Sequence, residues 1–368
     1  MELPWREPPW SSGRLFKGFS LRDYVPGAGV VERWRLSTSL HYMPAAAILD
    51  PPADLFEHRL LFVTGKGGVG KTTVAAALGL AAAQHGLRTI VCELDARERL
   101  HSLFNVSTRG FEEVELVPDL HAIAIDPQHA IEEYLLLQIK VRAVYDMLFK
   151  NRIFDYFAAA TPGLAELVTI GKVWELAQPD RLKKKSVPYD LVIVDAPATG
   201  HALAMLEAPE TFKKIARVGP IHRQAGYIQS FLHDPATTAI IAVATAEEMP
   251  VNETLDLRRE LRERVGLDIS LAVVNSLEPE FFSLDEIAEL RKLDEIAPIE
   301  AAVLQSQRAT MQAGQHARLG EELERPLVDL PFIYEKSIGR AELNTLADKL
   351  ADDLAEQFER ATGRSGGA

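Results

Sequence analysis

Short apolar runs alternate with helical stretches along most of the chain. Several of the runs are continuously apolar, which is typical of parallel strands that are buried on both faces. The helices predicted between them include Thr72–His85 and Asn252–Val265. This alternation predicts an α/β fold with a doubly wound, mostly parallel sheet, in which a ligand would bind at the carboxyl ends of the strands. The predicted strands are Arg59–Thr64, Arg88–Glu93, Leu120–Ile125, Asp190–Asp195, Thr238–Thr245, Asp268–Asn275 and Leu327–Leu330.

An inserted helical subdomain is predicted at about residues 128–187, where the alternation stops. This stretch has almost no polar face from Ile131 to Phe157. A helix that is apolar nearly all round must be buried or must meet a partner. A second apolar helical stretch, from Phe212 to Leu232, follows the fourth predicted strand. Two interpretations remain: a subdomain packed on itself, or a groove for an apolar client segment.

Residues 1–58 differ from the rest of the chain. They are rich in proline, show weak periodicity and contain three of the four tryptophans, Trp5, Trp10 and Trp34. The interpretations are a flexible extension, a translation start at Met43, or a docking arm with aromatic anchors.

The last long helix carries one apolar stripe and an acidic face. A helix lying on a membrane surface would be basic on its polar face. We therefore expect a packed terminal helix at the end of a domain spanning 59–360, followed by a flexible tail over 361–368. The stripe consists of Leu343, Leu346, Leu350, Leu354 and Phe358, and the acidic face of Asp348, Asp352, Asp353 and Glu356.

Composition narrows the class of protein. The net charge of −13 disfavours a general nucleic-acid binder, which would normally show a basic footprint. The single cysteine, Cys92, excludes an intrachain disulfide and a Cys-x-x-Cys site and fits a reducing compartment. We find neither an apolar run of membrane-spanning length nor the continuous apolar core of a signal peptide. The expected location is cytoplasmic, with peripheral membrane association as an alternative.

The stretch Gly65–Thr73 lies between an apolar run and a run of good helix formers. Strand, glycine loop, Gly-Lys-Thr and helix together form the context of a P-loop, whose backbone N–H groups wrap phosphates. Lys71 would reach the β- and γ-phosphates of ATP, and the Thr72 hydroxyl would bind Mg²⁺. A glycine-rich turn without a ligand is the alternative. The predicted contacts are Gly65, Lys66, Gly67, Gly68, Val69, Gly70, Lys71, Thr72 and Thr73.

Lys66 adds a second lysine to this loop, in the pattern Lys-Gly-Gly-x-Gly-Lys-Thr. The pattern resembles the deviant Walker A motif of a group of dimeric ATPases. The resemblance implies that Lys66 crosses a dimer interface and touches the nucleotide bound by the partner subunit. A solvated loop lysine is the alternative.

Two strands end in acids. Asp95 matches the position of the switch I aspartate of the same group, which orients the attacking water; a plain acid at a strand end is the alternative. Glu93 would bind Mg²⁺ through water or only end its strand. Leu191–Asp195 has the Walker B pattern, in which Asp195 would hold Mg²⁺ through water. The loop that follows is predicted to be switch II, because Gly200 would let its backbone change conformation when the γ-phosphate leaves. Its residues are Pro197, Thr199, Gly200 and His201.

The Asp-x-x-x-Thr-Gly-His segment after Walker B resembles switch II of the arsenite-pump ATPase (ArsA) family, which includes ATPases that target tail-anchored membrane proteins. Thr161–Glu166 resembles the Pro-Gly-x-x-Glu segment of that family's helical insertion. The resemblance implies that Asn275 recognises adenine and that Pro331 and Phe332 form a late loop near the base. The similarity covers about residues 59–355.

The chain departs from the family pattern at several points. After Asp95 the usual switch I residues are replaced by Ala96-Arg97-Glu98. One cysteine cannot supply the thiolates of an arsenite site, so no such site is expected. The chain also lacks the zinc-binding Cys-x-x-Cys of the eukaryotic targeting ATPases. Because the pump ATPases have two tandem halves and this chain has one P-loop, two chains must supply two sites.

Together these features predict a Mg²⁺-dependent ATPase that acts as a nucleotide-driven dimeric switch. The partner would be a second copy or a paralogue, with an apolar client segment or a membrane protein as a further partner and no nucleic acid. One alternative is a positioning ATPase of the MinD/ParA kind. Another is a nucleotide-binding, non-hydrolysing partner of an active paralogue.

Overall fold

The structure is a computed structural model, and all of the residues it describes belong to the unit Asp50–Ala368. Asp95, most of the extension 1–58, Pro162, the middle of the helical insertion and the tail after Thr362 lie outside the described residues. Leu55 and His58 are described and buried. The described residues are 55–94, 99–107, 110–138, 161, 163–181, 186–292 and 297–362.

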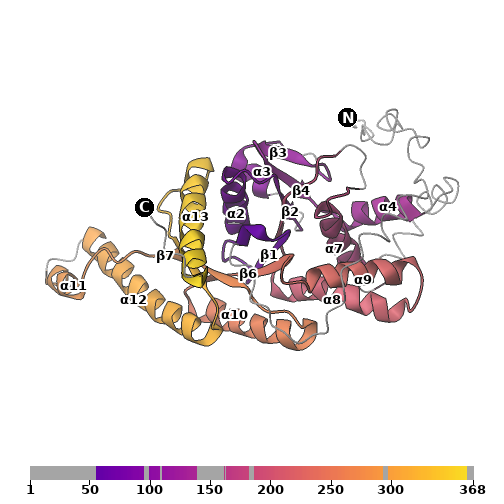
Figure 1. Ribbon diagram of the computed structural model, residues 1–368. Coiled ribbons are helices and arrows are strands. Elements are labelled where there is room, and N and C mark those ends of the chain that lie inside the picture. Colours follow the sequence, from indigo (N-terminus) through magenta and orange to yellow (C-terminus); the bar gives the residue numbers. More distant parts are fainter. Residues whose placement is uncertain are drawn as a thin grey trace, which may run out of the picture. The chain divides into compact units, whose positions relative to one another are not determined.

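The described residues form an eight-stranded sheet in the order β3-β4-β2-β5-β1-β6-β7-β8 (Figure 1). Apart from the β3–β4 pair, neighbouring strands are parallel, so the predicted α/β fold with a doubly wound, mostly parallel sheet is confirmed. The strands are β1 (Leu60–Gly65), β2 (Thr89–Glu93), β3 (Val114–Val117), β4 (Leu120–Ala124), β5 (Leu191–Asp195), β6 (Thr238–Thr245), β7 (Leu271–Leu277) and β8 (Leu327–Pro331).

Strand β1 lies in the middle of the sheet, between β5 and β6. Its residues Leu60–Val63 are completely buried, as expected for a continuously apolar strand covered on both faces. The register pairs Val63 with Asp195 and Gly65 with Val243. The chain that leaves β1 therefore emerges beside the ends of two neighbouring strands, which is where open parallel sheets bind ligands.

Strand β3 was missed by the sequence analysis. It is antiparallel to β4 and forms the edge of the sheet, joined to β4 by a tight turn at Pro118 and Asp119. Asp119 has a φ of +65°, a left-handed conformation that Asp tolerates in turns. The Pro-Asp dipeptide after Val117 is typical of a turn and could have indicated a hairpin. The strand itself is too short to show a clear alternation of apolar and polar residues.

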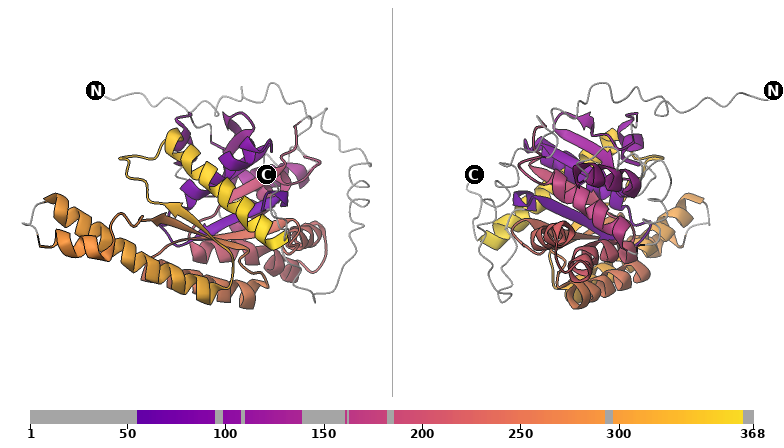
Figure 2. Two further views of the ribbon diagram at one scale, coloured as in Figure 1. Left: turned by 60° about the vertical axis from the view of Figure 1, so that its left-hand side comes forward. Right: turned by 90° about the vertical axis from the view of Figure 1, so that its right-hand side faces the viewer.

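Helices cover both faces of the sheet, as Figure 2 shows. Helices α2 and α13 pack together on one face, while α7, α8 and α10 contact β5, β1 and β6. The longer helices are α2 (Lys71–Gln84), α4 (Pro127–Gln138), α7 (Leu164–Leu176), α8 (Thr199–Ile215), α9 (Pro220–Leu232), α10 (Glu248–Glu260), α12 (Ala297–Leu323) and α13 (Arg340–Thr362); the short ones are α3 (Arg99–Phe104), α11 (Leu284–Leu290), a 3₁₀ turn (Leu55–Glu57) and a π-helical turn (Leu261–Val265) that continues α10.

The predicted apolar stripe of α13 packs on the domain from Leu343 to Leu354, and the side chain of Phe358 lies outside the described residues. Leu343, Leu346 and Leu350 are buried against α2 and β8, and Leu354 is partly buried beside them. Among the residues that the structure describes, no helix combines the length and apolar composition needed to cross a bilayer.

Candidate functional site

The P-loop joins β1 directly to α2. Gly68 and Gly70 have φ values of +93° and +91°, which residues other than glycine rarely adopt. A Cβ atom on Gly65 would lie 2.2 Å from the carbonyl oxygen of Val243 on β6, whereas one on Gly67 would meet nothing within 4 Å. The loop is therefore wedged against β6 at its start and open at its centre, which leaves a cradle where backbone N–H groups could face phosphates.

Lys71 lies at the first position of α2, and its Nζ donates to the carbonyl oxygen of Lys66 at 3.0 Å. The Lys71 side chain thus folds back over the P-loop, where a phosphate would bind. The amino end of α2 adds a positive dipole end to the same place.

The Thr72 hydroxyl donates to Asp195 Oδ2 at 2.6 Å, and Asp195 is almost fully buried. This contact follows from the fold: Asp195 ends β5, and β5 pairs with the strand that leads into the loop. The structure therefore brings together the two residues predicted to hold Mg²⁺. Both offer oxygen ligands, which a hard cation such as Mg²⁺ prefers, so this donor set fits the ion.

The side chain of Lys66 forms an ion pair with Glu253, with 3.0 Å between Nζ and Oε1. Glu253 lies on α10, the helix that follows β6. The sequence analysis did not identify Glu253. The one feature that could have indicated a place beside the P-loop is that Glu253 follows the end of a predicted buried strand closely.

Asp95 and the residues Ala96, Arg97 and Glu98 lie outside the described residues. Glu93, at the end of β2, is buried, and its Oε1 accepts a hydrogen bond from the Leu100 amide at 3.0 Å. Its Oε2 lies 3.7 Å from His101 Nδ1. Of the two roles considered for Glu93, these contacts favour a structural one, since they tie the end of β2 to the first turns of α3.

Switch II differs from the expectation in one respect. The predicted loop through His201 is wrong, because α8 already begins at Thr199. Ala198 caps the helix, and its carbonyl oxygen accepts from the amides of His201 and Ala202. The residues that follow are good helix formers, which draw Thr199, Gly200 and His201 into the first turn. Pro197 stays in the short connection from Asp195.

The predicted base-recognition residues lie at the ends of β7 and β8. Asn275 is buried, and its Nδ2 donates to the carbonyl oxygen of Val69 in the P-loop at 2.9 Å. It packs so closely that a Cβ on Gly70 would lie 2.3 Å from this nitrogen. Pro331 ends β8, opposite Leu277 of β7. The structure thus connects Asn275 to the phosphate loop, and adenine recognition stays a prediction.

A polar face of α12 holds the segment that follows Asn275. The buried carboxylate of Glu278 accepts hydrogen bonds from Arg308 Nη1 at 3.0 Å and from the Tyr334 hydroxyl. The side-chain amide of Gln312 contacts both the Glu278 amide and the Ser276 carbonyl oxygen, at 2.7 and 3.2 Å. These contacts were missed, since they join elements that are distant in sequence.

Comparison with known proteins agrees with this geometry. A family model described as anion-transporting ATPase (ArsA) matches residues 58–226. The ATPase BagA of Mycobacterium tuberculosis is 32% identical over 244 residues, which cover 65% of this chain and 71% of that protein. This chain belongs to the ArsA ATPase family. The resemblance seen in the sequence is therefore confirmed.

Two further ArsA-type relatives extend the match. The putative arsenical pump-driving ATPase of Halobacterium salinarum is 26% identical over 342 residues, covering 88% of this chain and 48% of that protein. ATPase GET3 of Komagataella phaffii is 26% identical over 254 residues, covering 59% of this chain and 72% of that protein. The halobacterial match reaches well beyond the segment of the family model.

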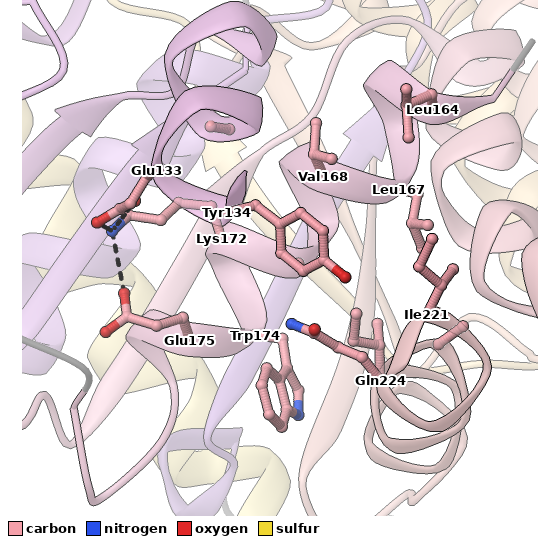
Figure 3. Close-up of a pocket in the computed structure, with 14 residues that line it drawn as sticks. Glu133, Tyr134, Leu164, Leu167, Val168, Lys172, Trp174, Glu175, Ile221 and Gln224 are labelled. Atoms are coloured by element: carbon pink, nitrogen blue, oxygen red, sulfur yellow. Dashed lines mark hydrogen bonds and ion pairs between the residues drawn. The ribbon is translucent and has the colours of Figure 1, made fainter. Parts of the chain in front are cut away.

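This ArsA family member also has an apolar pocket between α4, α7 and α9, shown in Figure 3. The pocket has a volume of about 70 Å³ and is partly open to solvent. Tyr134 comes from α4, Trp174 from α7, and Ile221 and Gln224 from α9. The predicted apolar stretches thus meet at one place, and part of the insertion lies outside the described residues.

One wall of the pocket is charged and buried. Lys172 Nζ lies 2.7 Å from Glu133 Oε2 and 3.1 Å from Glu175 Oε2. Burial alone would lower the pKa of Lys172, but the carboxylates of Glu175 and Glu133 outweigh it and raise the pKa above its usual value. The ammonium group therefore stays charged inside an otherwise apolar region.

The charged wall continues away from the pocket toward β5. Arg181 donates to Glu175 Oε1 at 3.2 Å and makes two hydrogen bonds to Glu113, at 3.0 and 2.7 Å. The Tyr189 hydroxyl donates to Glu113 at 2.8 Å. Burial would raise the pKa of Glu113, but Arg181 outweighs it and lowers the pKa to about 2. This network joins α7 to the start of β5.

Cys92 lies in the middle of β2 and is completely buried. Burial raises the pKa of its thiol, which disfavours the thiolate form that binds soft metals.

Proposed function

We propose that this ArsA family member is a Mg²⁺-dependent ATPase that works as a nucleotide-driven dimeric switch. The observation that carries the proposal is the hydrogen bond between Thr72 and Asp195 beneath a P-loop that also contains Lys66. A threonine hydroxyl and a Walker B carboxylate in contact, at the start of a helix and the end of its neighbouring strand, form the arrangement with which P-loop ATPases hold Mg²⁺ and ATP.

Each part of the site has a role in this proposal. The loop amides from Gly67 to Gly70 and the Lys71 ammonium bind the phosphates, and Thr72 and Asp195 hold the ion. When bound, Mg²⁺ neutralises charge that develops on the phosphate oxygens. Asp95 orients the attacking water. Catalysis here depends on positioning and charge neutralisation, so these few groups suffice.

Asn275 contributes to base recognition from the end of β7. Its present bond to Val69 O would be exchanged or extended when a base enters, so that base and phosphate recognition are linked through one side chain.

Lys66 makes the proposed ATPase dimeric. It reaches from one chain to the nucleotide of the other, so neither chain has a complete site alone. The partner is a second copy of this chain or a paralogue.

Helix α8 provides the proposed link to a client. It begins with the switch II residues Thr199, Gly200 and His201 and packs against α7 and α9, which line the apolar pocket. A change at switch II would therefore move helices of the pocket. The pocket has a volume of only about 70 Å³, and we infer that this movement would widen it for a client segment.

An apolar client segment or a membrane protein partner fits this surface better than arsenite does. The printed name of the halobacterial relative refers to an arsenical pump. However, this sequence has a single cysteine, Cys92, which is buried, and a metalloid site needs several accessible thiolates. We place the activity in the cytoplasm, with peripheral association at a membrane.

The test is steady-state ATP hydrolysis by the purified wild type beside Lys71→Ala and Asp95→Asn. We expect each variant to lose on the order of 10²–10³-fold in kcat, because each removes a group that acts in the transition state. Lys214→Ala, in an exposed ion pair on α8, is the matched control and should keep wild-type activity. ATP binding without turnover by the wild type, unchanged in Asp95→Asn, would instead indicate a nucleotide-binding partner of an active paralogue.

A further inference from the structure

The lysine that must reach another subunit is held within its own chain. The Lys66 ammonium lies 3.0 Å from Glu253 Oε1, and the two side chains are 27% and 36% exposed. Neither group is deeply buried, so the pair is close to solvent and able to open.

The fold places this acid beside the loop. Gly65 at the end of β1 pairs with Val243 of β6, and α10 begins shortly after β6 ends. Carboxyl ends of adjacent parallel strands meet at one edge of the sheet, and the ion pair with Lys66 shows that the second turn of α10 lies next to the P-loop. Since α10 also packs on β1 and β6, Glu253 is fixed in place except for its own side-chain rotation.

In the dimeric switch proposed above, the Lys66 ammonium would leave Glu253 when it turns to the phosphates bound by the other subunit. The ion pair with Glu253 would then compete with the contact across the interface, and whatever stabilises the pair would oppose the dimer.

We propose that Glu253 is a positioning residue. It binds the Lys66 side chain in the monomer and thereby weakens nucleotide-dependent dimer formation. This inference rests on the proposed function of Lys66 as the residue that crosses the interface. It goes beyond that function because it assigns a role to an acid outside the P-loop and both switches. Glu253 acts through Lys66 and needs no contact with the nucleotide of its own chain.

The expected effect is modest. Partly exposed ion pairs contribute little, so Glu253→Gln should strengthen dimer formation with a non-hydrolysable ATP analogue about two- to fivefold. The strengthening should shrink as salt is raised, because salt screens such pairs. The thermal unfolding midpoint of Glu253→Gln should equal that of the wild type.

The experiment is analytical ultracentrifugation of the full chain with the analogue and Mg²⁺, at low and high salt. Glu248→Gln removes the same charge from an exposed position on the same helix and should leave the dimer constant unchanged. A double variant, Lys66→Gln with Glu253→Gln, should dimerise no better than Lys66→Gln alone, because the restraint acts only through the lysine.

The outcomes separate the two proposals. If the wild type dimerises with the analogue and Lys66→Gln does not, but Glu253→Gln matches or falls below the wild type, the role of Glu253 is overturned and the dimeric switch stands. If the wild type stays monomeric, or Lys66→Gln dimerises normally, the interface role of Lys66 is wrong and the restraint falls with it.

Discussion

The nucleotide site and the charged wall of the apolar pocket use ionic groups in opposite ways. Lys66 and Glu253 are partly exposed and form one pair at the surface of the loop. Lys172 and Arg181 are almost completely buried, and each contacts two carboxylates. The proposed exchange of partners by Lys66 would therefore take place near water, whereas the lysine and the arginine of the wall are buried and each is bonded more than once.

The difference follows from the cost of desolvation. A buried charge that loses its partner is destabilising by several kcal/mol, so a buried network resists rearrangement. A surface pair contributes about 0–1 kcal/mol and opens easily. Helix α8 begins shortly after Asp195 and packs against α7 and α9, so it connects the two regions.

The largest effect on stability should come from breaking the buried wall. Lys172→Met removes one of the two cations that contact the buried Glu175 carboxylate, while Arg181 remains, and the free energy of unfolding should fall by about 2–3 kcal/mol. Lys214→Met, which removes an exposed partner of Glu210 on α8, should change it by less than about 0.5 kcal/mol. Urea unfolding followed by circular dichroism measures both. Equal effects in the two variants would show that the wall is not a structural unit.

The second effect is a loss of stability in acid that depends on Glu113. Its folded pKa of about 2 is below the ordinary value of 4.5, so the stabilisation is present above about pH 4.5 and is lost as the pH falls toward 2. Thermal midpoints of the wild type and Glu113→Gln should therefore converge between pH 4.5 and 2. Parallel curves over this range would contradict the pairing with Arg181.

The nucleotide site could be predicted from sequence to a greater extent than the pocket wall. Glycines and lysines in Gly65–Thr73 have a fixed spacing, and the apolar run before Asp195 predicts a neighbouring strand end, so the contact between Thr72 and Asp195 was foreseeable. The contacts of Glu253 and Glu278 could not be predicted in this way, because they depend on which strands are neighbours in the sheet. The sheet places elements side by side that are far apart in the chain.

Errors of the sequence analysis have similar causes. Strand β3 is short and lies at the sheet edge, where only one neighbour supports it, so periodicity gave no signal for Val114–Val117. Thr199 and Gly200 suggested a loop, but the strong helix formers after them extend α8 back to Thr199. The buried pairing of Lys172 with Glu175 was missed because charged residues in a helix ordinarily predict a solvated face.

The central claim is that two chains build each ATPase site, and mixing two inactive variants tests it most directly. Lys66→Ala retains its own Lys71, and Lys71→Ala retains the lysine that crosses to the partner. ATP hydrolysis by an equimolar mixture should return to about a quarter of the wild-type rate, since random pairing makes half of the dimers mixed and each mixed dimer holds one complete site. A mixture no more active than the separate variants would contradict the claim.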